Sequence, residues 1–534
     1  RRRSTTFCLF STETHESEGG SDREGDAVVD ARRRVRAGRV GMTAAAALSV
    51  MPSRDAKIFV PTVKARRQPR RSVSRKGRMG DLAIETQGDE VEDPDDFGVE
   101  RGVPFTRKRA FYRVESAQAR DLAMLLASVH SDEAVAASSS SFRDADRISG
   151  GVSVLDAMSG CGVRCVRYLL QGEVSSVHAN DADPNVMDTL SENLAGAHAR
   201  GATGVSSVTN VDAHRLLAKC YLDEARYDIV DVDSFGSENL VSATMRCVKL
   251  GGYAYLTSTD ALALCGKSPG ALSANYGGAI VAPNTQGVNE LGLRVFVGDA
   301  VRIGAAMGLK VTPVFSLFHP HGPVFRAMLR VEALVGDWDC GSVGHVGRCR
   351  ACGDARVVDP GELGGAFCHR CDAIRASFRD DDGSIGGAMD RRSCLEVSGP
   401  MWLGPLHERS TVEKLRSKAA EKGWIGREGA SVEDGTKVKG QMSLEALLGS
   451  FAAESDPRLP PFHHRTDELG RSGRGLKRGI PAMKAWVEEL KSRGFAACKT
   501  HVDSRGLKTN APMEQIVDAA NAVTHARDTA SNVT

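Results

Sequence analysis

The chain has 534 residues, of which 41% are hydrophobic and 26% charged, a composition typical of a globular protein with two or three domains. Its formal net charge is only +2, so a surface that binds nucleic acid would need local clusters of Lys and Arg. No run of 18 apolar residues occurs, which argues against a membrane span. The 13 cysteines are spread along the chain, a distribution that favours free thiols in a reducing compartment over a disulfide framework.

Residues 1–104 are expected to form a disordered or targeting region. Residues 42–78 contain ten Lys or Arg against the single acid Asp55. This bias is typical of a plastid or mitochondrial transit peptide, and a basic disordered tail of a nuclear or cytoplasmic protein is the alternative. Residues 81–100 are acidic and are interpreted as a solvated linker, so the fold is expected to begin near Phe105.

Short β-branched segments alternate with amphipathic segments between Val152 and Val331. This alternation predicts a parallel sheet covered by helices on both faces. The last two strand-like segments flank a His-Pro-His-Gly-Pro turn at 319–323, which predicts a hairpin and hence an antiparallel strand at the sheet edge. A parallel sheet with an antiparallel edge hairpin is the Rossmann-like α/β arrangement of the class I methyltransferases, and we assign residues 105–335 to such a domain. The strand-like segments are VSVLDA, SVHAN, SSVTN, YDIVDV, GYAYLT, KVTPVFSLF and VFRAMLRVEA.

Polar side chains and glycines follow the strands of this predicted sheet, where its ligands are expected to bind. In LDAMSGCGVR, Gly160 and Gly162 allow a tight turn and a close approach of the backbone to a ligand. Asp181 follows the second strand, where a carboxylate can accept hydrogen bonds from both ribose hydroxyls. Asp212 and Ala213 follow the third strand, where an adenine is expected. Together they predict a dinucleotide or adenosyl cofactor, although some of these acids are also expected to cap helices.

The fourth strand ends in RYDIVDVDSFGS. Asp231 and Asp233 share one face of the strand because side chains alternate along it, and Asp233 falls at its carboxyl edge. Amino-group methyltransferases place an acidic or amide residue at this position, usually before a proline and an aromatic residue. A carboxylate there accepts the hydrogen bond, and then the proton, of an amine whose lone pair is delocalised into a purine ring. We expect Asp233 to be catalytic and Phe235 to stack on the base; a buried capping aspartate is the alternative.

These motifs together resemble the tRNA (guanine-26) dimethyltransferase family, from about Phe111 to Pro512. The resemblance implies a class I fold, S-adenosyl-L-methionine as methyl donor, and tRNA as the partner, with one or two methyl groups added to the exocyclic amine of a guanine. A monomer without membrane association is expected. Two alternatives stay open: the same chemistry on another tRNA or ribosomal RNA guanine, and a catalytically silent RNA-binding protein. The resemblance rests on FYRVESAQARDL, LDAMSGCGVRCVRYL, ANDADPN, DVDSFGS, LTSTDALALCG, NYGG, ELGLR, GPMWLGPL and THVDSRGLKTNAP.

The family pattern also implies roles for single residues. Arg120 and Arg164 are expected to pair with the methionine carboxylate of the cofactor, beside the strand-end residues named above. Asp233 takes the place of the family's catalytic carboxylate. The chain departs from the usual Asp-Pro-Phe-Gly run, because Ser234 replaces the proline that would fix the backbone after the carboxylate. The FYRVES and DSFGS variants resemble a divergent branch found in plants and algae.

A second motif lies beyond the hairpin, in GRCRACGDARVVDPGELGGAFCHRCD, and contains two CxxC pairs separated by 15 residues. Two such pairs can meet in tetrahedral thiolate coordination, and Gly353 suits the tight turn after the first pair. We predict a structural zinc site with no open position for a catalytic water, and His369 is expected to lie outside it. The predicted ligands are Cys349, Cys352, Cys368 and Cys371.

Residues 336–534 are expected to form a zinc-bearing α+β domain that binds RNA. Two of its segments are rich in cations: HHRTDELGRSGRGLKRG, and KTHVDSRGLKTNAP with Lys499, His501, Arg505 and Lys508. Such patches suit phosphate contacts, although a run of charges is more often solvated surface. ELKSRGF followed by KTH predicts a helix that leads into a short strand, as in small α+β nucleic-acid modules.

Overall fold

The structure is a computed structural model, and it describes residues 96–108, 110–139, 151–234, 240–281, 287–320, 322–376, 395–426, 441–470, 476 and 479–531. All of them belong to one unit of the chain, Gln87–Thr534. The predicted targeting segment and Phe235 lie outside the described residues, and localisation therefore stays a prediction.

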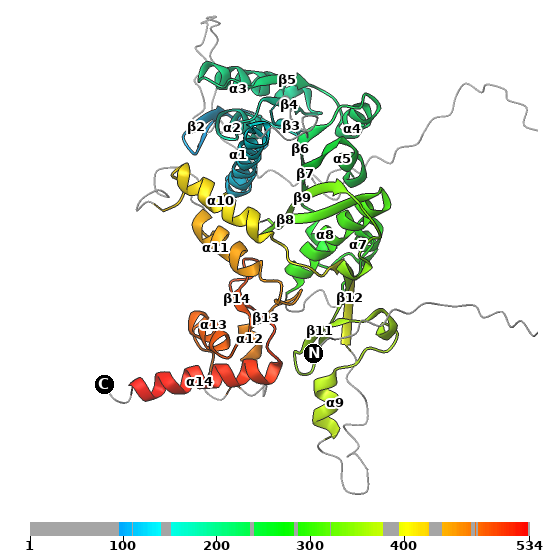
Figure 1. Ribbon diagram of the computed structural model, residues 1–534, viewed down its shortest axis with the longest axis vertical. Helices are drawn as coiled ribbons and strands as arrows, with labels where there is room; N and C mark the ends of the chain where they lie inside the picture. The colour runs from blue at the N-terminus through cyan, green and yellow to red at the C-terminus, as the bar shows by residue number, and fades with distance from the viewer. Residues whose placement is uncertain are drawn as a thin grey trace, which may run out of the picture. The chain divides into compact units, whose positions relative to one another are not determined.

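Seven strands form the central sheet in the order β5-β4-β3-β6-β7-β9-β8, with helices on both sides (Figure 1). Strands β3 to β7 pair in parallel, which confirms the predicted α/β class. The hairpin β8–β9 lies at the sheet edge as predicted, but its antiparallel strand is β9, which is inserted between β7 and the edge strand β8. The strands are β3 (Ser153–Asp156), β4 (Ser176–Asn180), β5 (Val205–Thr209), β6 (Tyr227–Asp233), β7 (Val248–Ser258), β8 (Leu309–His319) and β9 (Val324–Ala333).

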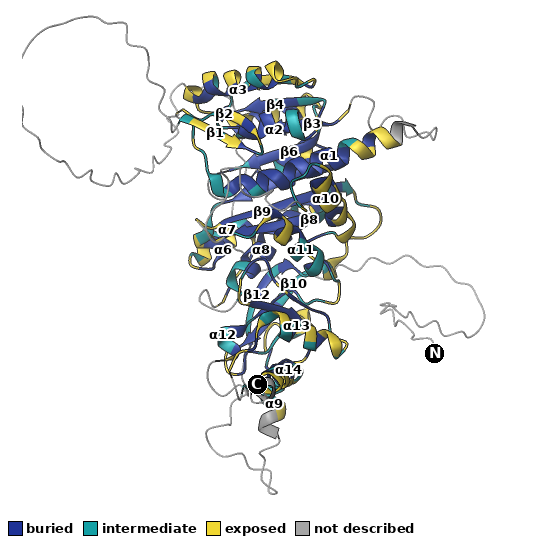
Figure 2. Ribbon diagram, turned by 90° about the vertical axis from the view of Figure 1, so that its left-hand side faces the viewer, coloured by how far each residue is buried: buried dark blue, intermediate teal, exposed yellow. Residues whose placement is uncertain are grey.

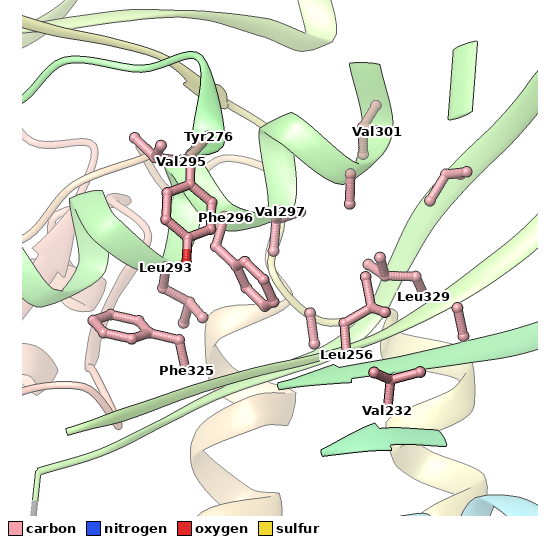
Figure 3. Close-up of a cluster of buried hydrophobic side chains, with 14 of the residues drawn as sticks. Val232, Leu256, Tyr276, Leu293, Val295, Phe296, Val297, Val301, Phe325 and Leu329 are labelled. Carbon is pink, nitrogen blue, oxygen red and sulfur yellow. The ribbon is translucent and has the colours of Figure 1, made fainter. Parts of the chain in front are cut away.

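Two hydrophobic cores lie on the two faces of this sheet. Because side chains alternate along a strand, Val154 joins the core under α1, α2 and α3, whereas Leu155 joins the core under α4, α5 and α8. Figure 3 shows the second core, where Val232 and Leu256 of the sheet face Phe296 of α8. Figure 2 shows the strands as mostly buried ribbons. The helices of this part are α1 (Ala117–Ser139), α2 (Val163–Gln171), α3 (Met187–Ala199), α4 (Ala213–Leu222), α5 (Val241–Cys247), α6 (Ala261–Leu264), α7 (Pro269–Tyr276) and α8 (Val288–Ala306).

A short hairpin precedes the sheet, formed by β1 (Phe97–Glu100) and β2 (Val103–Thr106). The expectation that the fold begins near Phe105 is therefore wrong. Glu100 had been placed in a solvated linker, yet it is fully buried. The acidic composition concealed this strand, because buried partners for its carboxylate come from helices later in the chain. The single-turn helix η2 (Val114–Ser116) then leads into α1.

Beyond the hairpin β8–β9, two small three-stranded sheets follow, in the orders β11-β10-β12 and β13-β15-β14. The predicted passage from a helix into a short strand is confirmed by α13 and β14. The elements are η4 (Cys340–Ser342), β10 (Val343–Cys349), β11 (Ala355–Val358), η5 (Pro360–Glu362), α9 (His369–Ala376), β12 (Leu395–Trp402), α10 (Arg409–Glu421), α11 (Leu444–Glu454), β13 (His464–Arg465), α12 (Thr466–Leu469), α13 (Met483–Ser492), β14 (Ala497–Lys499), β15 (Gly506–Thr509) and α14 (Met513–Ser531); η3 (Pro184–Val186) precedes α3.

A buried carboxylate links the central sheet to these C-terminal elements. Glu290 in the first turn of α8 is fully buried and pairs with Arg294, with His463 Nδ1 at 2.6 Å, and with Lys508 of β15. Burial alone would raise the pKa of Glu290, but Lys508 and Arg294 outweigh it and hold the pKa far below its usual value. The network joins three segments that are far apart in sequence.

The described cysteines are all free thiols, in agreement with the prediction from their distribution. Across the described ranges, no helix combines the length and the apolar character that crossing a membrane requires.

Candidate active site

A cavity opens beside the glycine loop that connects β3 to α2. Gly160 and Gly162 both have positive φ, +55° and +80°, in the left-handed region that glycine tolerates best. A Cβ atom on Gly162 would clash with Leu190 Cδ1 in α3, so any larger residue would have to displace that buried side chain in addition to adopting the positive φ. Gly160 lines the cavity, whereas Gly162 shapes the turn into α2. The cavity walls include Phe111, Arg113, Ser116, Arg120, Gly160, Arg164, Asp181, Asp233, Ser234, Thr259 and Arg326.

Asp181, directly after β4, lines this cavity, but the residues after β5 do not. Its Oδ2 accepts the N–H of Gly160 at 2.8 Å, and its Oδ1 accepts the N–H of Asp183 at 2.9 Å. Each carboxylate oxygen has two lone pairs, so one remains on each for a ribose hydroxyl. Asp212 is exposed and caps α4, accepting the N–H of the third helical residue at 3.2 Å, and Ala213 is buried in the helix. Capping thus accounts for Asp212, and the cofactor roles of Asp212 and Ala213 stay predictions.

Asp233 is the last residue of β6 and lines the same cavity, with 24% of its side chain exposed. Arg326 of β9 forms an ion pair with Asp233 Oδ1 at 3.1 Å, and Arg164 of α2 donates to Asp233 Oδ2. Burial alone would raise the pKa of Asp233, but the two guanidinium groups outweigh it and hold the pKa far below its usual value. Asp233 therefore remains a carboxylate at neutral pH, at the strand end that the sequence pattern indicated.

Arg164 is engaged by carboxylates of the protein itself. Its Nη1 donates to Asp231 Oδ1 at 2.6 Å, and its Nη2 donates to Asp233. Asp231 is fully buried and also accepts the hydroxyl of Tyr168 at 3.1 Å. Burial raises the pKa of Asp231 to about 7, against the effect of Arg164 and with the repulsion of Asp156. Arg164 thus neutralises the strand-end aspartates, and its predicted contact with the cofactor stays a prediction.

Arg120 lines the cavity from α1, but its guanidinium is also engaged inside the protein. Its Nε donates to both oxygens of Glu100, at 2.9 and 3.0 Å, and Nη2 donates to the carbonyl of Arg113 at 2.8 Å. Arg167 bridges Glu100 at 2.9 Å and Asp121 at 2.6 Å. Burial alone would raise the pKa of Glu100, but Arg120 and Arg167 lower it to about 2. This network ties β1 and the segment before α1 to the helices α1 and α2.

Sequence reasoning missed Arg326, the second partner of Asp233. It is 3% exposed and also donates to Thr257 Oγ1 at 2.9 Å and to Ser116 Oγ at 3.1 Å. The available signal was an arginine within the apolar strand VFRAMLRVEA, because arginine is rarely buried without a charged partner. The pairing itself depends on β9 lying beside β7, which the hairpin pattern alone did not specify.

Ser234, which replaces the family's proline, is 4% exposed. Its hydroxyl donates to the carbonyl of Thr257 in the neighbouring strand β7 at 3.0 Å. A proline would restrict the backbone covalently, whereas this hydrogen bond ties the residue after Asp233 to the sheet. The hydroxyl therefore restrains the backbone after Asp233, the role that the family's proline was expected to have.

The four predicted zinc ligands meet in one cluster. Cys349 ends β10, Cys352 lies in the following turn, and Cys368 and Cys371 lie at the start of α9. The Sγ atoms of Cys349 and Cys371 are 3.7 Å apart, and those of Cys352 and Cys368 are 3.5 Å apart. Tetrahedral coordination with Zn–S bonds of about 2.3 Å requires Sγ atoms roughly 3.8 Å apart, so the cluster fits a closed zinc site. His369 is outside the cluster, as predicted.

The C-terminal cations do not all face solvent. Lys508 is buried and paired with Glu290, and His501 is buried, with Nδ1 2.8 Å from Glu454 Oε1. The expectation that these two residues contact phosphate is therefore wrong, because both are held inside the protein. Lys499 and Arg505 are exposed, as that expectation requires.

Comparisons with known proteins agree with this geometry. A family model described as N2,N2-dimethylguanosine tRNA methyltransferase matches residues 88–521. The tRNA (guanine(26)-N(2))-dimethyltransferase of Pyrococcus furiosus is 28% identical over 381 residues, covering 68% of this chain and 85% of the relative. The enzyme of the same name from Methanosphaerula palustris is 27% identical over 372 residues, covering 69% of this chain and 85% of the relative.

Among solved structures, Trm1 from Pyrococcus horikoshii in complex with S-adenosyl-L-methionine matches with a TM-score of 0.59 and 21% sequence identity. The match covers 79% of this chain and 99% of that one, and it supports the fold. The family match spans both the sheet with its cavity and the cysteine cluster. The chain therefore belongs to the N2,N2-dimethylguanosine tRNA methyltransferase family.

Proposed function

We propose that this protein transfers methyl groups from S-adenosyl-L-methionine to the exocyclic amine of guanine 26 in tRNA, forming the dimethylated base. The observation that carries the proposal is the carboxylate of Asp233, a quarter exposed in a cavity that also contains Asp181 and the glycine loop. The curated relatives named above carry this activity in their names and cover most of the chain.

The cavity residues fit the donor. Asp181 offers one free lone pair on each oxygen to a ribose, and Gly160 brings backbone close to the ligand. The methionine carboxylate needs a cation, and Arg120, which lines the cavity, is the cation whose Nη1 makes no hydrogen bond to the described residues. When bound, S-adenosyl-L-methionine supplies an electrophilic methyl group on a sulfonium.

Asp233 would act on the guanine amine. Its ionised carboxylate accepts a hydrogen bond from the amine, orients the nitrogen lone pair, and stabilises the positive charge that develops on nitrogen. Arg326 and Arg164 hold the carboxylate in place and lower its basicity. A weak base is sufficient, because the amine becomes a strong acid once it has gained the methyl group. The proton then passes to Asp233 or to water.

The target guanine has to leave its stack to reach Asp233, at a cost of roughly a few kcal/mol that contacts elsewhere on the RNA must offset. Phe235 is proposed to stack on the extruded base, although it lies outside the described residues. The four cysteines would hold a structural zinc ion, since all four positions of the tetrahedron are filled by the protein.

The test is incubation of the purified protein with unmodified tRNA and labelled donor, followed by mapping of the labelled nucleotide. Asp233→Ala is expected to abolish transfer while the donor still binds. Asp223→Ala, which removes an exposed carboxylate paired with Lys219 at the end of α4, is the matched control and is expected to be fully active. Normal turnover by Asp233→Ala, or label at a different nucleotide, would overturn the proposal.

A further inference from the structure

We call the cavity that contains Gly160, Asp181 and Asp233 the cofactor cavity. A second cavity, of about 380 Å³, lies beside it. We call this second one the junction cavity, because segments that are far apart in the sequence meet around it. The central-sheet part of the chain contributes Glu115 of η2, Gln118 of α1, Asn289 of α8, and Leu317 to Pro320 at the end of β8. The C-terminal part contributes Gln441, Met442 and Leu447 around the start of α11, Arg465 of β13, and the residues from Lys499, at the end of β14, to Arg505 before β15. Its volume is in the range of pockets that hold small ligands.

The two cavities share two walls. Ser116 lines the cofactor cavity and Glu115 lines the junction cavity, one residue apart on η2. His319 of β8 lines the junction cavity, and its partner in the hairpin register, Val324 of β9, lines the cofactor cavity. The two cavities are therefore neighbours along η2 and the β8–β9 hairpin, an arrangement in which consecutive units of one polymer could occupy them.

The inside of the junction cavity combines apolar surface with open hydrogen-bond acceptors. Leu317, Leu447 and Val502 contribute buried apolar side chains. The side-chain amide of Gln118 donates to the backbone carbonyl of Met442, and that of Gln441 donates to the backbone carbonyl of Glu115 at 3.1 Å. Their Oε1 atoms make no hydrogen bond to other residues in the described part of the chain, so they can accept hydrogen bonds from a ligand. Such a lining suits a flat, partly polar ring.

Cations lie at the rim of the cavity, and one of them differs from the others. Arg505 pairs with Asp467 at 2.9 Å and Asp503 at 3.8 Å, and Arg465 pairs with the same two acids at 2.8 and 3.5 Å. These two guanidinium groups are thus balanced by two carboxylates. Lys499 is exposed and forms no ion pair with any described residue, so its ammonium can meet a phosphate without breaking an internal contact.

We propose that the junction cavity binds a nucleotide of the RNA substrate that flanks the target guanosine, with its base against the apolar floor and its phosphate at Lys499. The inference rests on the proposed function, since it presumes an RNA substrate. Unstacked bases are recognised by apolar and hydrogen-bonding surfaces, and phosphates by exposed cations. Holding the neighbour in this way offsets the cost of unstacking the target base.

Two substitutions test the two halves of this inference. Lys499→Glu removes the phosphate partner, and Ser504→Trp fills the cavity from an exposed position on its wall. The matched controls are Lys484→Glu and Ser492→Trp, which make the same changes at exposed positions of α13 outside the cavity. Methylation of tRNA is measured as kcat and KM at several salt concentrations, together with donor binding and thermal unfolding.

Lys499→Glu is expected to raise the KM for tRNA about tenfold and to reduce the slope of log KM against log salt by about 0.7–0.9, the loss of one phosphate contact. Ser504→Trp is expected to raise KM about tenfold with the slope unchanged, because loss of base contact is not ionic. The kcat at saturating tRNA, the donor affinity and the melting temperature are expected to match those of the controls.

Variants whose KM stays within twofold of their controls, or an effect from only one of the pair, would overturn the inference. Failure of the proposed function looks different, because the unsubstituted protein would then not methylate tRNA at all. Cross-linking is a second measurement: 4-thiouridine placed next to the target guanosine is expected to label peptides that contain residues 441–447 or 499–505. Label confined to other peptides contradicts a nucleotide in this cavity.

Discussion

Replacement of Arg326 by methionine tests the electrostatic account of Asp233 directly. The change removes one of the two guanidinium groups that hold the carboxylate, the one at 3.1 Å, and leaves Arg164 in place. Methionine has a similar length and no charge, so the buried site stays filled. With the cation gone, the pKa of Asp233 is expected to rise, since burial continues to favour the protonated form.

The magnitude follows from the geometry. A guanidinium in direct contact with a carboxylate lowers its pKa by about 1–3 units, which corresponds to about 1.4–4 kcal/mol. The acid limb of kcat/KM against pH is expected to move upward by the same 1–3 units, because kcat/KM reports groups of the free enzyme. Asp231, whose pKa lies at about 7, is coupled to the same cluster, so variants are compared with each other at each pH.

The assay is methyl transfer to tRNA between pH 2 and 8, a range that reaches below the usual pKa of an aspartate, with donor affinity and thermal unfolding measured alongside. Arg330→Met is the matched control, because Arg330 lies on the same face of β9 but pairs with Glu408 at 2.6 Å, outside the cavity. Arg326→Lys keeps the charge and is expected to restore most of the acid tolerance. An acid limb that is identical in Arg326→Met, Arg330→Met and the unsubstituted protein would refute the reasoning.

Three further predictions follow from the described contacts. Ser234→Ala removes the hydrogen bond to β7 and is expected to lower kcat several-fold, roughly 1 kcal/mol, with donor affinity unchanged in a binding assay; unchanged kcat would show that the hydroxyl restrains nothing. Cys352→Ser is expected to abolish stoichiometric zinc in atomic absorption, while Cys340→Ser, at an exposed free thiol, retains one zinc per chain; equal zinc in both variants would contradict the four-cysteine site. The pKa of Glu100 is about 2 in the folded chain against an ordinary 4.5. Its ionised form therefore contributes about 3 kcal/mol to the free energy of unfolding above pH 4.5, and this contribution is lost as the pH falls toward 2. Glu100→Gln is therefore expected to flatten stability against pH in that range, measured by urea unfolding, whereas Glu192→Gln, at an exposed ion pair with Lys108, leaves the dependence unchanged; an equal acid dependence in the two variants would count against the buried network.

The catalytic sheet was largely predictable from the sequence because its signals are local. The alternating β-branched segments predicted every strand of the central sheet to within a few residues. The alternation of side chains along β6 placed Asp231 and Asp233 on one face, with Asp233 at the carboxyl end of the strand. The glycine loop was also readable, since positive φ at Gly160 and Gly162 is a property of those two residues. The two CxxC pairs specified their cluster, because metal geometry demands that the four thiols meet.

Other features could not be predicted because their partners come from distant segments. Glu100 was interpreted as part of a solvated linker, and only the packing of α1 and α2 against the first hairpin provides the arginines that bury it. Lys508 was interpreted as a phosphate contact, yet Glu290, 218 residues earlier in the chain, neutralises it inside the protein. The sequence alone does not distinguish a charged residue that faces water from one that pairs with a buried partner.

The sequence by itself determined which residues can do chemistry and the order in which strands and helices present them, because periodicity, glycine conformation and metal-ligand spacing depend on near neighbours in the chain. The tertiary structure decided how those groups are charged and what lies beside them. Arg326 reaches Asp233 only because β9 returns next to β7, and the junction cavity exists only where several remote segments meet. Electrostatic energy depends on distance through space, and the chain fixes that distance only when it folds.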